Sequence, residues 1–383
     1  MIYYGHQHIT EKDIAAVEQV LKSDWLTQGP AIEAFERKVA DYCGVEYAVA
    51  VTNATSALHI ACKAAGLGTG DILWTSPITF VASANCGRYC GADVDFVDID
   101  DKTYNMSIDE LEEKLKTADK LPKVVIPVHL AGQSCDMEKI KALSDKYGFT
   151  VIEDASHAVG ADYKDGKVGS CQFSDMAVFS FHPVKIITTG EGGMVLTNNK
   201  NLYEKLQLYR SHGITRNPDL MTKAAGGPWY YQQIDLGFNY RMTDLQAALG
   251  CSQMDSLDKF VARRRYLVER YNRKLADLPL RMPYCAGNTD PSWHIYIVRV
   301  DFSKVKITKK EIFAKMKERG IVLNLHYIPV HTQQYYQQLG FREGDFPVSE
   351  RYYREAMTLP LYYDLTEEQQ DKVIAALHEV LAE

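Results

Sequence analysis

Short apolar runs alternate with helix-like segments between about residue 45 and residue 200. The runs are YAVAVT, DILWTS, DVDFVDID, KVVIPVHL, FTVIEDA, MAVFSF and GMVLTN, and segments such as TSALHIACKAAG and DMEKIKALSDKYG lie between them. Because the runs are almost entirely apolar instead of alternating with polar residues, we expect strands that are buried on both faces. Strand–helix alternation of this kind predicts an α/β fold with a mainly parallel sheet.

The pattern changes after residue 200, where helical periodicity dominates. A long helical stretch over residues 243–278 is expected to carry the chain from one domain to the next. Residues 290–383 predict a smaller α+β unit, with strands at WHIYIVRVDF and VLNLHY and helices at KKEIFAKMKERG and TEEQQDKVIAALHEVLAE. We therefore expect a large domain over residues 1–250, including the N-terminal segment, and a small C-terminal domain over residues 251–383.

Composition narrows the functional classes. The chain has 383 residues, 46% of them apolar, and carries 50 acidic against 43 basic residues, so nothing draws it globally to nucleic acid or to an anionic membrane. Its N-terminus lacks the features of a signal peptide, and no apolar run is long enough to span a membrane. The eight cysteines are scattered, and His6 and His8 fit an ordinary terminus better than a metal site. We expect a cytoplasmic protein without membrane insertion, nucleic-acid partner or metal.

The segment NATSALH follows the run YAVAV and opens a helix. Asn53, Thr55 and Ser56 could simply cap that helix. Alternatively, the free N–H groups of the helix start could bind a phosphate, and small side chains would not block its approach. The glycine-rich GLGTGD ends a helix and precedes a strand, which is the wrong order for a dinucleotide-binding loop and disfavours a nicotinamide oxidoreductase.

Two further features carry candidate chemistry. Glu153 and Asp154 end an apolar run, where open α/β sheets collect their ligands; they either cap the next turn or hold the protonated nitrogen of a bound heterocycle. Lys185 stands between two apolar runs and is either an exposed loop lysine or an amine nucleophile with a lowered pKa in a dry site. A phosphate turn, a strand-ending acid and a lysine on one face of a sheet together are the parts needed to hold pyridoxal phosphate (PLP).

Many blocks of the sequence resemble the DegT-like nucleotide-sugar aminotransferases, which are fold-type I PLP enzymes. The blocks are LTQGP, NATSALH, PITFVASAN, PVHLAGQ, IEDASHAVGA, VFSFHPVKIITTGEGG, RSHG, GFNYRMTDLQAALG and LHYIPVHTQ, in family order over nearly the whole chain. The resemblance implies a large domain with a mainly parallel seven-stranded sheet and a smaller α+β C-terminal domain.

The resemblance also implies roles for individual residues. Lys185 matches the lysine that binds the cofactor covalently and catalyses the reaction, and Asp154 matches the partner of the pyridine nitrogen. The remaining implied cofactor contacts are His157 and Phe80 at the ring, Ala54, Thr55 and Ser180 at the phosphate, and Asn239 reaching the phosphate from the neighbouring subunit of a homodimer. The implied substrate contacts are His182, Arg241, His326 and Tyr4.

Within this family, LKSDWLTQGP, ITTGEGG, LYRSHGITR and HYIPVH resemble most closely the branch that acts in pseudaminic acid biosynthesis. That branch transfers the amino group of L-glutamate to C4 of a UDP-linked 4-keto-6-deoxy-N-acetylhexosamine. Enzymes that make UDP-bacillosamine, perosamine or 4-amino-arabinose derivatives share most of these blocks and remain alternatives, as does a non-catalytic sensor, which Lys185 argues against. The aromatic segment Pro228–Gln233 either covers an active site or packs at an interface.

Overall fold

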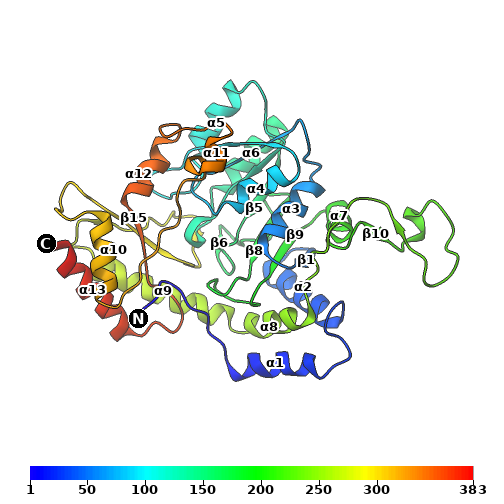
Figure 1. Cartoon of the computed structure of the whole chain (residues 1–383), viewed down its shortest axis with the longest axis horizontal. Coiled ribbons are helices and arrows are strands. Elements are labelled where there is room, and N and C mark those ends of the chain that lie inside the picture. The colour runs from blue at the N-terminus through cyan, green and yellow to red at the C-terminus, as the bar shows by residue number, and fades with distance from the viewer. Residues whose placement is uncertain (383) are drawn as a thin grey trace.

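A seven-stranded sheet lies at the centre of the larger part of the molecule, in a computed structural model that describes residues 1–382 (Figure 1). Its strands, in spatial order, are β1 (Tyr47–Val51), β9 (Gly193–Thr197), β8 (Met176–Ser180), β5 (Thr150–Asp154), β4 (Val124–Ile126), β2 (Ile72–Thr75) and β3 (Asp93–Phe96). β9 runs antiparallel to both of its neighbours, β1 and β8, and the other neighbouring strands pair in parallel. Each of the seven predicted runs forms one of these strands, so the predicted α/β fold is confirmed.

Helices cover both faces of this sheet. They include α2 (Pro30–Cys43), α3 (Ala54–Ala64), α4 (Ala82–Tyr89), α5 (Ile108–Thr117), α6 (Met137–Tyr147) and α7 (Lys200–Arg210). In β8, Phe179 belongs to the hydrophobic cluster on one face and Val178 to the cluster on the other. Since successive side chains of a strand point to opposite faces, this double burial explains why the strands are apolar throughout.

The C-terminal part of the chain, residues 257–382, has its own core. It contains α9 (Leu257–Lys274), α10 (Lys309–Glu318), α11 (Gln334–Gln337), α12 (Pro347–Glu355), α13 (Glu367–Ala382) and a sheet of β12 (Leu280–Arg281), β14 (Tyr296–Val300) and β15 (Ala356–Leu359). Phe260 at the start of α9 packs in the core of the larger part, whereas Tyr271 near its end packs in the C-terminal core. One helix thus joins the two cores, and the division at residue 250 stays a prediction.

Two local expectations are wrong. The long helical stretch is two helices, α8 (Asp244–Met254) and α9, because the chain turns at Asp255 and Ser256. The segment VLNLHY is not a strand: Val322 N donates a hydrogen bond to Ile2 O, whereas Asn324 bridges to Thr358, so its backbone changes partner within a few residues. The strand that pairs with β14 at this place is β15, which the sequence pattern did not single out.

An arm, residues 214–236, projects from the body of the molecule and is drawn in green at the right of Figure 1. It consists of β10 (Ile214–Thr215), β11 (Gln232–Gln233) and the short helix η2 (Pro218–Leu220). The remaining elements are α1 (Glu11–Leu21), η1 (Leu130–Gly132), η3 (Val330–Thr332) and the small sheet of β13 (Thr289–Asp290), β6 (Asp162–Tyr163) and β7 (Gly166–Lys167). Within residues 1–382, no helix is both long and apolar enough to cross a membrane.

Candidate active site

A cavity of about 800 Å³ opens at the carboxyl ends of β5 and β8, between the two cores. Ten of the twelve predicted site residues line it: Tyr4, Ala54, Thr55, Phe80, Asp154, His157, Ser180, His182, Lys185 and His326. The carboxyl ends of parallel strands are where open α/β sheets bind ligands, and the volume is typical of a small-molecule site. The structure therefore gathers residues that lie as much as 322 positions apart in the sequence, from Tyr4 to His326, around one cavity.

The start of α3 forms one wall. Asn53 caps the helix, since its side chain accepts a hydrogen bond from Ser56 N at 2.8 Å. The N–H groups of Ala54 and Thr55 have no acceptor inside the helix and remain directed out of its positive end. The capping role and the anion-binding role are thus filled by different groups of the same turn.

A glycine allows β9 to begin directly against this turn. A Cβ atom added to Gly193 would lie 2.5 Å from the carbonyl carbon of Asn53 and 2.6 Å from the nitrogen of Ala54. Gly193 also pairs with Ser180, the last residue of β8, which lines the cavity. Two strands and a helix start therefore converge on a small cup with free N–H groups and a hydroxyl, which is suited to a phosphate.

The two acids at the end of β5 point in opposite directions, as the two-residue period of a strand requires. Asp154 lines the cavity, and its carboxylate accepts hydrogen bonds from Ser83 Oγ at 2.5 Å and from Ser156 N at 3.1 Å. Glu153 lies on the other face, 2.7 Å from His129 Nε2 and 2.5 Å from Ser174 Oγ. Only Asp154 is available to a ligand, and its two donors fix the orientation of its carboxylate.

Lys185 lies in the loop after β8 and is directed into the same cavity. Burial lowers the pKa of its amine from 10.5 to about 8, although the charge of Asp154 acts in the opposite direction. A lysine with this pKa is neutral in an appreciable fraction of molecules near neutral pH, and it can therefore act as a nucleophile or base.

Three buried histidines surround the lysine. Burial, and secondarily the charge of Lys185, lowers the pKa of His157, His294 and His326, in the last case to about 3. The imidazoles are therefore neutral donors and acceptors at physiological pH. His157 Nδ1 accepts a hydrogen bond from Ala131 N at 3.3 Å, so the ring proton is on Nε2.

His294 was missed by the sequence analysis. Its ring lies 4.5 Å from that of His157, it lines the cavity, and its Nδ1 has no hydrogen-bond partner among residues 1–382. In the sequence this histidine only precedes an apolar run, and nothing distinguishes it from a buried strand residue. Only the folded structure shows that His294 lies beside His157 and lines the cavity.

Aromatic rings complete the wall. Phe80 is 58% exposed because it faces the open cavity, and its ring centroid lies 6.3 Å from that of Tyr327. Tyr327, also missed, places its hydroxyl 3.0 Å from His157 Nε2. Tyr4 lies beside His326, with 5.2 Å between ring centroids, and burial raises the pKa of its hydroxyl despite a hydrogen bond with Asn324.

These residues fit pyridoxal phosphate. The cup at the start of α3 is suited to its phosphate, the Asp154 carboxylate to its pyridine nitrogen, and the Lys185 amine to its aldehyde. No group of three or more histidine, cysteine, aspartate or glutamate side chains within the described part of the chain is placed to hold a metal ion.

Asn239 and Arg241 do not line this cavity. The segment that carries them runs beside the end of β1, where Tyr240 O accepts a hydrogen bond from Thr52 N at 2.9 Å and Arg241 bridges to Val51. Asn239 is exposed, and Arg241 lines a second hollow of about 530 Å³ beside α2. Within one chain these two side chains therefore lie outside the cavity, and their contacts with the phosphate and the substrate stay predictions.

Known proteins share this architecture. The sequence matches the DegT/DnrJ/EryC1/StrS aminotransferase family over residues 7–378. It is 38% identical to the spore coat polysaccharide biosynthesis protein SpsC of Bacillus subtilis in an alignment of 387 positions, which covers 99% of this chain and 96% of that protein. Helicobacter pylori PseC, an aminotransferase involved in the biosynthesis of pseudoaminic acid, is 30% identical with a TM-score of 0.91, over 100% of this chain and 99% of that one. Streptococcus pneumoniae Spr1654, described as a sugar aminotransferase and solved in a PLP form, is 28% identical with a TM-score of 0.89, over 99% and 98% of the two chains.

Proposed function

Since the chain belongs to the DegT/DnrJ/EryC1/StrS aminotransferase family and is a PLP-dependent sugar aminotransferase, we propose that it acts on a UDP-linked 4-keto sugar. The reaction transfers the amino group of L-glutamate to C4 of a UDP-4-keto-6-deoxy-N-acetylhexosamine and gives UDP-4-amino-4,6-dideoxy-N-acetyl-β-L-altrosamine, a step of pseudaminic acid biosynthesis. The fold shared with PseC and the sequence blocks of that branch support the choice of sugar. The single observation that carries the chemistry is the Lys185 amine in one cavity with the Asp154 carboxylate and the open start of α3.

Each cofactor contact has a physical basis. The N–H groups of Ala54 and Thr55 and the hydroxyl of Ser180 hold the phosphate at the positive end of α3. Asp154, oriented by Ser83 and Ser156, holds the proton on the pyridine nitrogen. When bound, PLP supplies an electron sink for the negative charge that develops at the reacting carbon. Phe80 and His157 orient the ring from the cavity wall.

Lys185 moves the proton. Its amine would hold the cofactor through the aldehyde group, and the lowered pKa provides the neutral amine that this role needs. The same nitrogen would then serve as the base that takes the proton from the α-carbon of glutamate and as the acid that gives it back. The surrounding histidines stay neutral and do not compete for this proton.

The sugar nucleotide binds on the side of the cavity formed by the C-terminal part of the chain. His326 and Tyr4 lie there side by side, and His182 is exposed at the opposite rim. Their neutral donors and acceptors suit the hydroxyl and acetamido groups of a sugar. Arg241 suits the diphosphate of the nucleotide when it comes from a second copy.

A homodimer completes the site. Among the lining residues that the structure describes, Lys185 is the only lysine or arginine, yet the cofactor phosphate, the UDP diphosphate and the glutamate carboxylates are all anionic. The arm exposes large apolar side chains, including Trp229 at 72% and Leu236 at 68%, which a partner would cover. Asn239 at the base of the arm is then free to reach the partner's phosphate cup. The aromatic segment 228–233 is accordingly an interface segment and lines no part of its own chain's cavity.

A second acceptor is favoured by the Bacillus relative, which functions in spore coat polysaccharide biosynthesis and has a higher sequence identity to this chain than PseC has. On this alternative the acceptor is another nucleotide-linked keto sugar of the bacillosamine, perosamine or 4-amino-arabinose type, and the same residues carry the chemistry. We place either reaction in the cytoplasm, where the eight unpaired cysteines of the structure remain reduced.

The test is a product analysis. The purified protein is incubated with L-glutamate and a panel of UDP- and dTDP-linked 4-keto sugars, and the products are identified by mass spectrometry and NMR. The proposal expects amination at C4 of the UDP-4-keto-6-deoxy-N-acetylhexosamine and none with the Lys185→Ala variant. Amination of a different panel member only would establish the second candidate, and the absence of an aminated product from every sugar of the panel would contradict both.

A further inference from the structure

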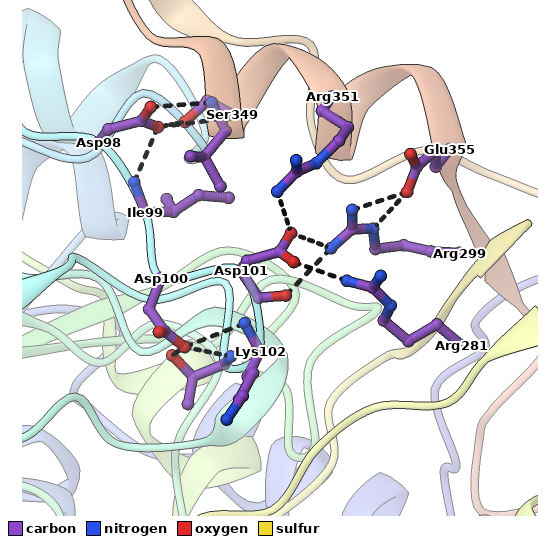
Figure 2. A network of polar contacts seen from close by, with 12 residues as sticks. Asp98, Ile99, Asp100, Asp101, Lys102, Arg281, Arg299, Ser349, Arg351 and Glu355 are labelled. Carbon is purple, nitrogen blue, oxygen red and sulfur yellow. Dashed lines mark hydrogen bonds and ion pairs between the residues drawn. The ribbon is translucent and has the colours of Figure 1, made fainter. Parts of the chain in front are cut away.

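Asp98 caps a helix from 250 residues away in the sequence (Figure 2). The helix is α12, whose own N-cap residue, Phe346, makes no capping hydrogen bond with its side chain. The carboxylate of Asp98 accepts hydrogen bonds from Val348 N at 2.9 Å, from Ser349 N at 2.9 Å and from Ser349 Oγ at 2.6 Å. A carboxylate at this end also interacts favourably with the helix dipole.

A second carboxylate of the same loop binds the same region. Asp101 accepts hydrogen bonds from Arg281 at 2.7 Å, from Arg299 at 2.6 Å and from Arg351 at 2.9 Å (Figure 2). Burial alone would raise the pKa of Asp101, but these three hydrogen bonds lower it to about 2, so the carboxylate is charged at all physiological pH values. The loop after β3, residues 97–104, which we call the junction loop, is thus fastened to α12 and β14 of the C-terminal part.

Apolar contacts continue the junction toward the cavity. Ile99 and Tyr104 of the junction loop share one hydrophobic cluster with Tyr352 of α12, and Leu325 and Tyr327 pack against that cluster. Leu325 and Tyr327 also line the active-site cavity. The cluster therefore lies directly beneath the wall of the cavity.

A short chain of hydrogen bonds leads from α12 to the predicted sugar contact. Tyr352 is fully buried and donates its hydroxyl proton to the carbonyl oxygen of His326 at 2.5 Å. Thr358 of β15, which follows α12 directly, lies 2.9 Å from His326 Nδ1 and pairs with Asn324. The backbone of residues 324–327 is not part of any regular strand, so these contacts define its position.

We infer that Asp98 is a positioning residue of this enzyme: by capping α12 across the junction, it holds the 324–327 segment where the acceptor sugar binds. Glutamate and the cofactor are handled by the opposite wall, with Lys185, Asp154 and the start of α3. Loss of the cap therefore weakens acceptor binding selectively. The acceptor side of this inference rests on the proposed function, whereas the positioning of the segment does not.

The test compares two helix caps. Asp98→Ala removes the cap of α12, and Asp98→Asn keeps one acceptor. Thr308→Ala removes the cap of α10, a helix of the same C-terminal part whose residues do not line the cavity. Loss of either cap should lower stability by a similar amount. Hydrogen–deuterium exchange on the purified holoenzyme should rise in peptides covering residues 324–330 for Asp98→Ala, less for Asp98→Asn, and stay at the wild-type level for Thr308→Ala. Equal exchange in all four proteins would overturn the positioning of the segment.

Kinetics test the link to acceptor binding. With the sugar identified by the product analysis, KM for that sugar should rise by about tenfold in Asp98→Ala, a typical consequence of losing a few hydrogen bonds. The rate at which glutamate alone bleaches the cofactor band should fall by less than the KM for the sugar rises, because the segment contacts that wall of the cavity through the Tyr327–His157 hydrogen bond, whereas Lys185 and Asp154 keep their positions. An unchanged KM, or an equal loss in both half-reactions, would overturn the acceptor role even where exchange is raised. Glutamate bleaching without transfer to any sugar would instead count against the proposed function, and the exchange experiment would still decide the positioning role.

Discussion

The hydroxyl of Tyr327 lies 3.0 Å from Nε2 of His157 and joins the C-terminal part of the chain to the wall of the cofactor cavity. Since Ala131 N donates to Nδ1 of the same imidazole, Nε2 carries the proton and donates to the tyrosine oxygen. Each end of the histidine is therefore occupied, and the ring is held in one tautomer and one orientation.

Replacement of Tyr327 by phenylalanine tests this contact. The variant leaves the Nε2–H group of a buried imidazole without an acceptor, which should lower the free energy of unfolding of the holoenzyme by about 1–3 kcal/mol. The affinity for PLP should fall and the absorption maximum of the bound cofactor should shift, because His157 is then free to rotate. Tyr335→Phe, on an exposed tyrosine of α11, is the control. A variant with the stability, spectrum and affinity of wild type would show that the hydrogen bond has no such role.

Substitution of Gly193 tests the phosphate cup. In Gly193→Ala the new methyl group meets the backbone of Asn53 and Ala54 at 2.5–2.6 Å and must displace the start of α3. We expect the dissociation constant for PLP to rise by about tenfold or more, since the helix-start N–H groups no longer converge on one point. Gly68→Ala is the matched control, because a Cβ atom at Gly68 meets nothing within 4 Å. Equal PLP affinities of the two variants in a fluorescence titration would contradict the assignment of the cup.

The pKa of Lys185 predicts a pH profile for cofactor loading. The neutral amine is the reactive form, and lowering the pKa from 10.5 to about 8 means that this form appears at lower pH. The rate at which PLP reacts with the apoenzyme should therefore rise about tenfold per pH unit below pH 8 and level off above it. Stopped-flow absorbance between pH 6 and pH 10 measures this profile. A rate that keeps rising toward pH 10 would mean that the lysine has an ordinary, solvated amine.

Hybrid dimers test the shared site. Asn239→Ala and Lys185→Ala are each expected to be defective, but a hybrid of the two contains one site with both residues intact. Mixing and re-equilibrating equal amounts of the two variants should therefore restore about a quarter of wild-type activity. No recovery from two defective variants, with hybrid formation verified by native mass spectrometry, would show that Asn239 acts within its own chain.

The strands and the cavity residues were predictable for a physical reason. A strand buried on both faces must be apolar throughout, so the apolar runs around Val178 and Ile152 predicted strands. The polar residues at the end of each run predicted the edge of the sheet where ligands bind. Asp154 and Lys185 stood out because a charge beside such a run is costly without a function. By contrast, His294 and Tyr327 look like ordinary members of the C-terminal part, and only the packing of the two cores brings them to the cavity.

The junction was also invisible in the sequence. Asp98 and Asp101 follow a strand and read as loop acids, because their partners on α12 and β14 lie about 200 to 250 positions later in the chain. Similarly, the pattern of VLNLHY resembles a strand, but its backbone pairs with Ile2 and with Thr358 instead of one neighbour. Local sequence carries no record of such long-range pairings.

The central claim is that Lys185 binds PLP covalently in this cavity and that an amino donor displaces it from the cofactor. The most direct measurement is the visible absorption spectrum of the purified holoenzyme before and after addition of L-glutamate alone. The account predicts a band near the wavelength of lysine-bound PLP that disappears with glutamate, with formation of stoichiometric 2-oxoglutarate, and the absence of both in Lys185→Ala. A band that persists after glutamate is added would contradict the account. So would a Lys185→Ala variant that still converts glutamate to 2-oxoglutarate.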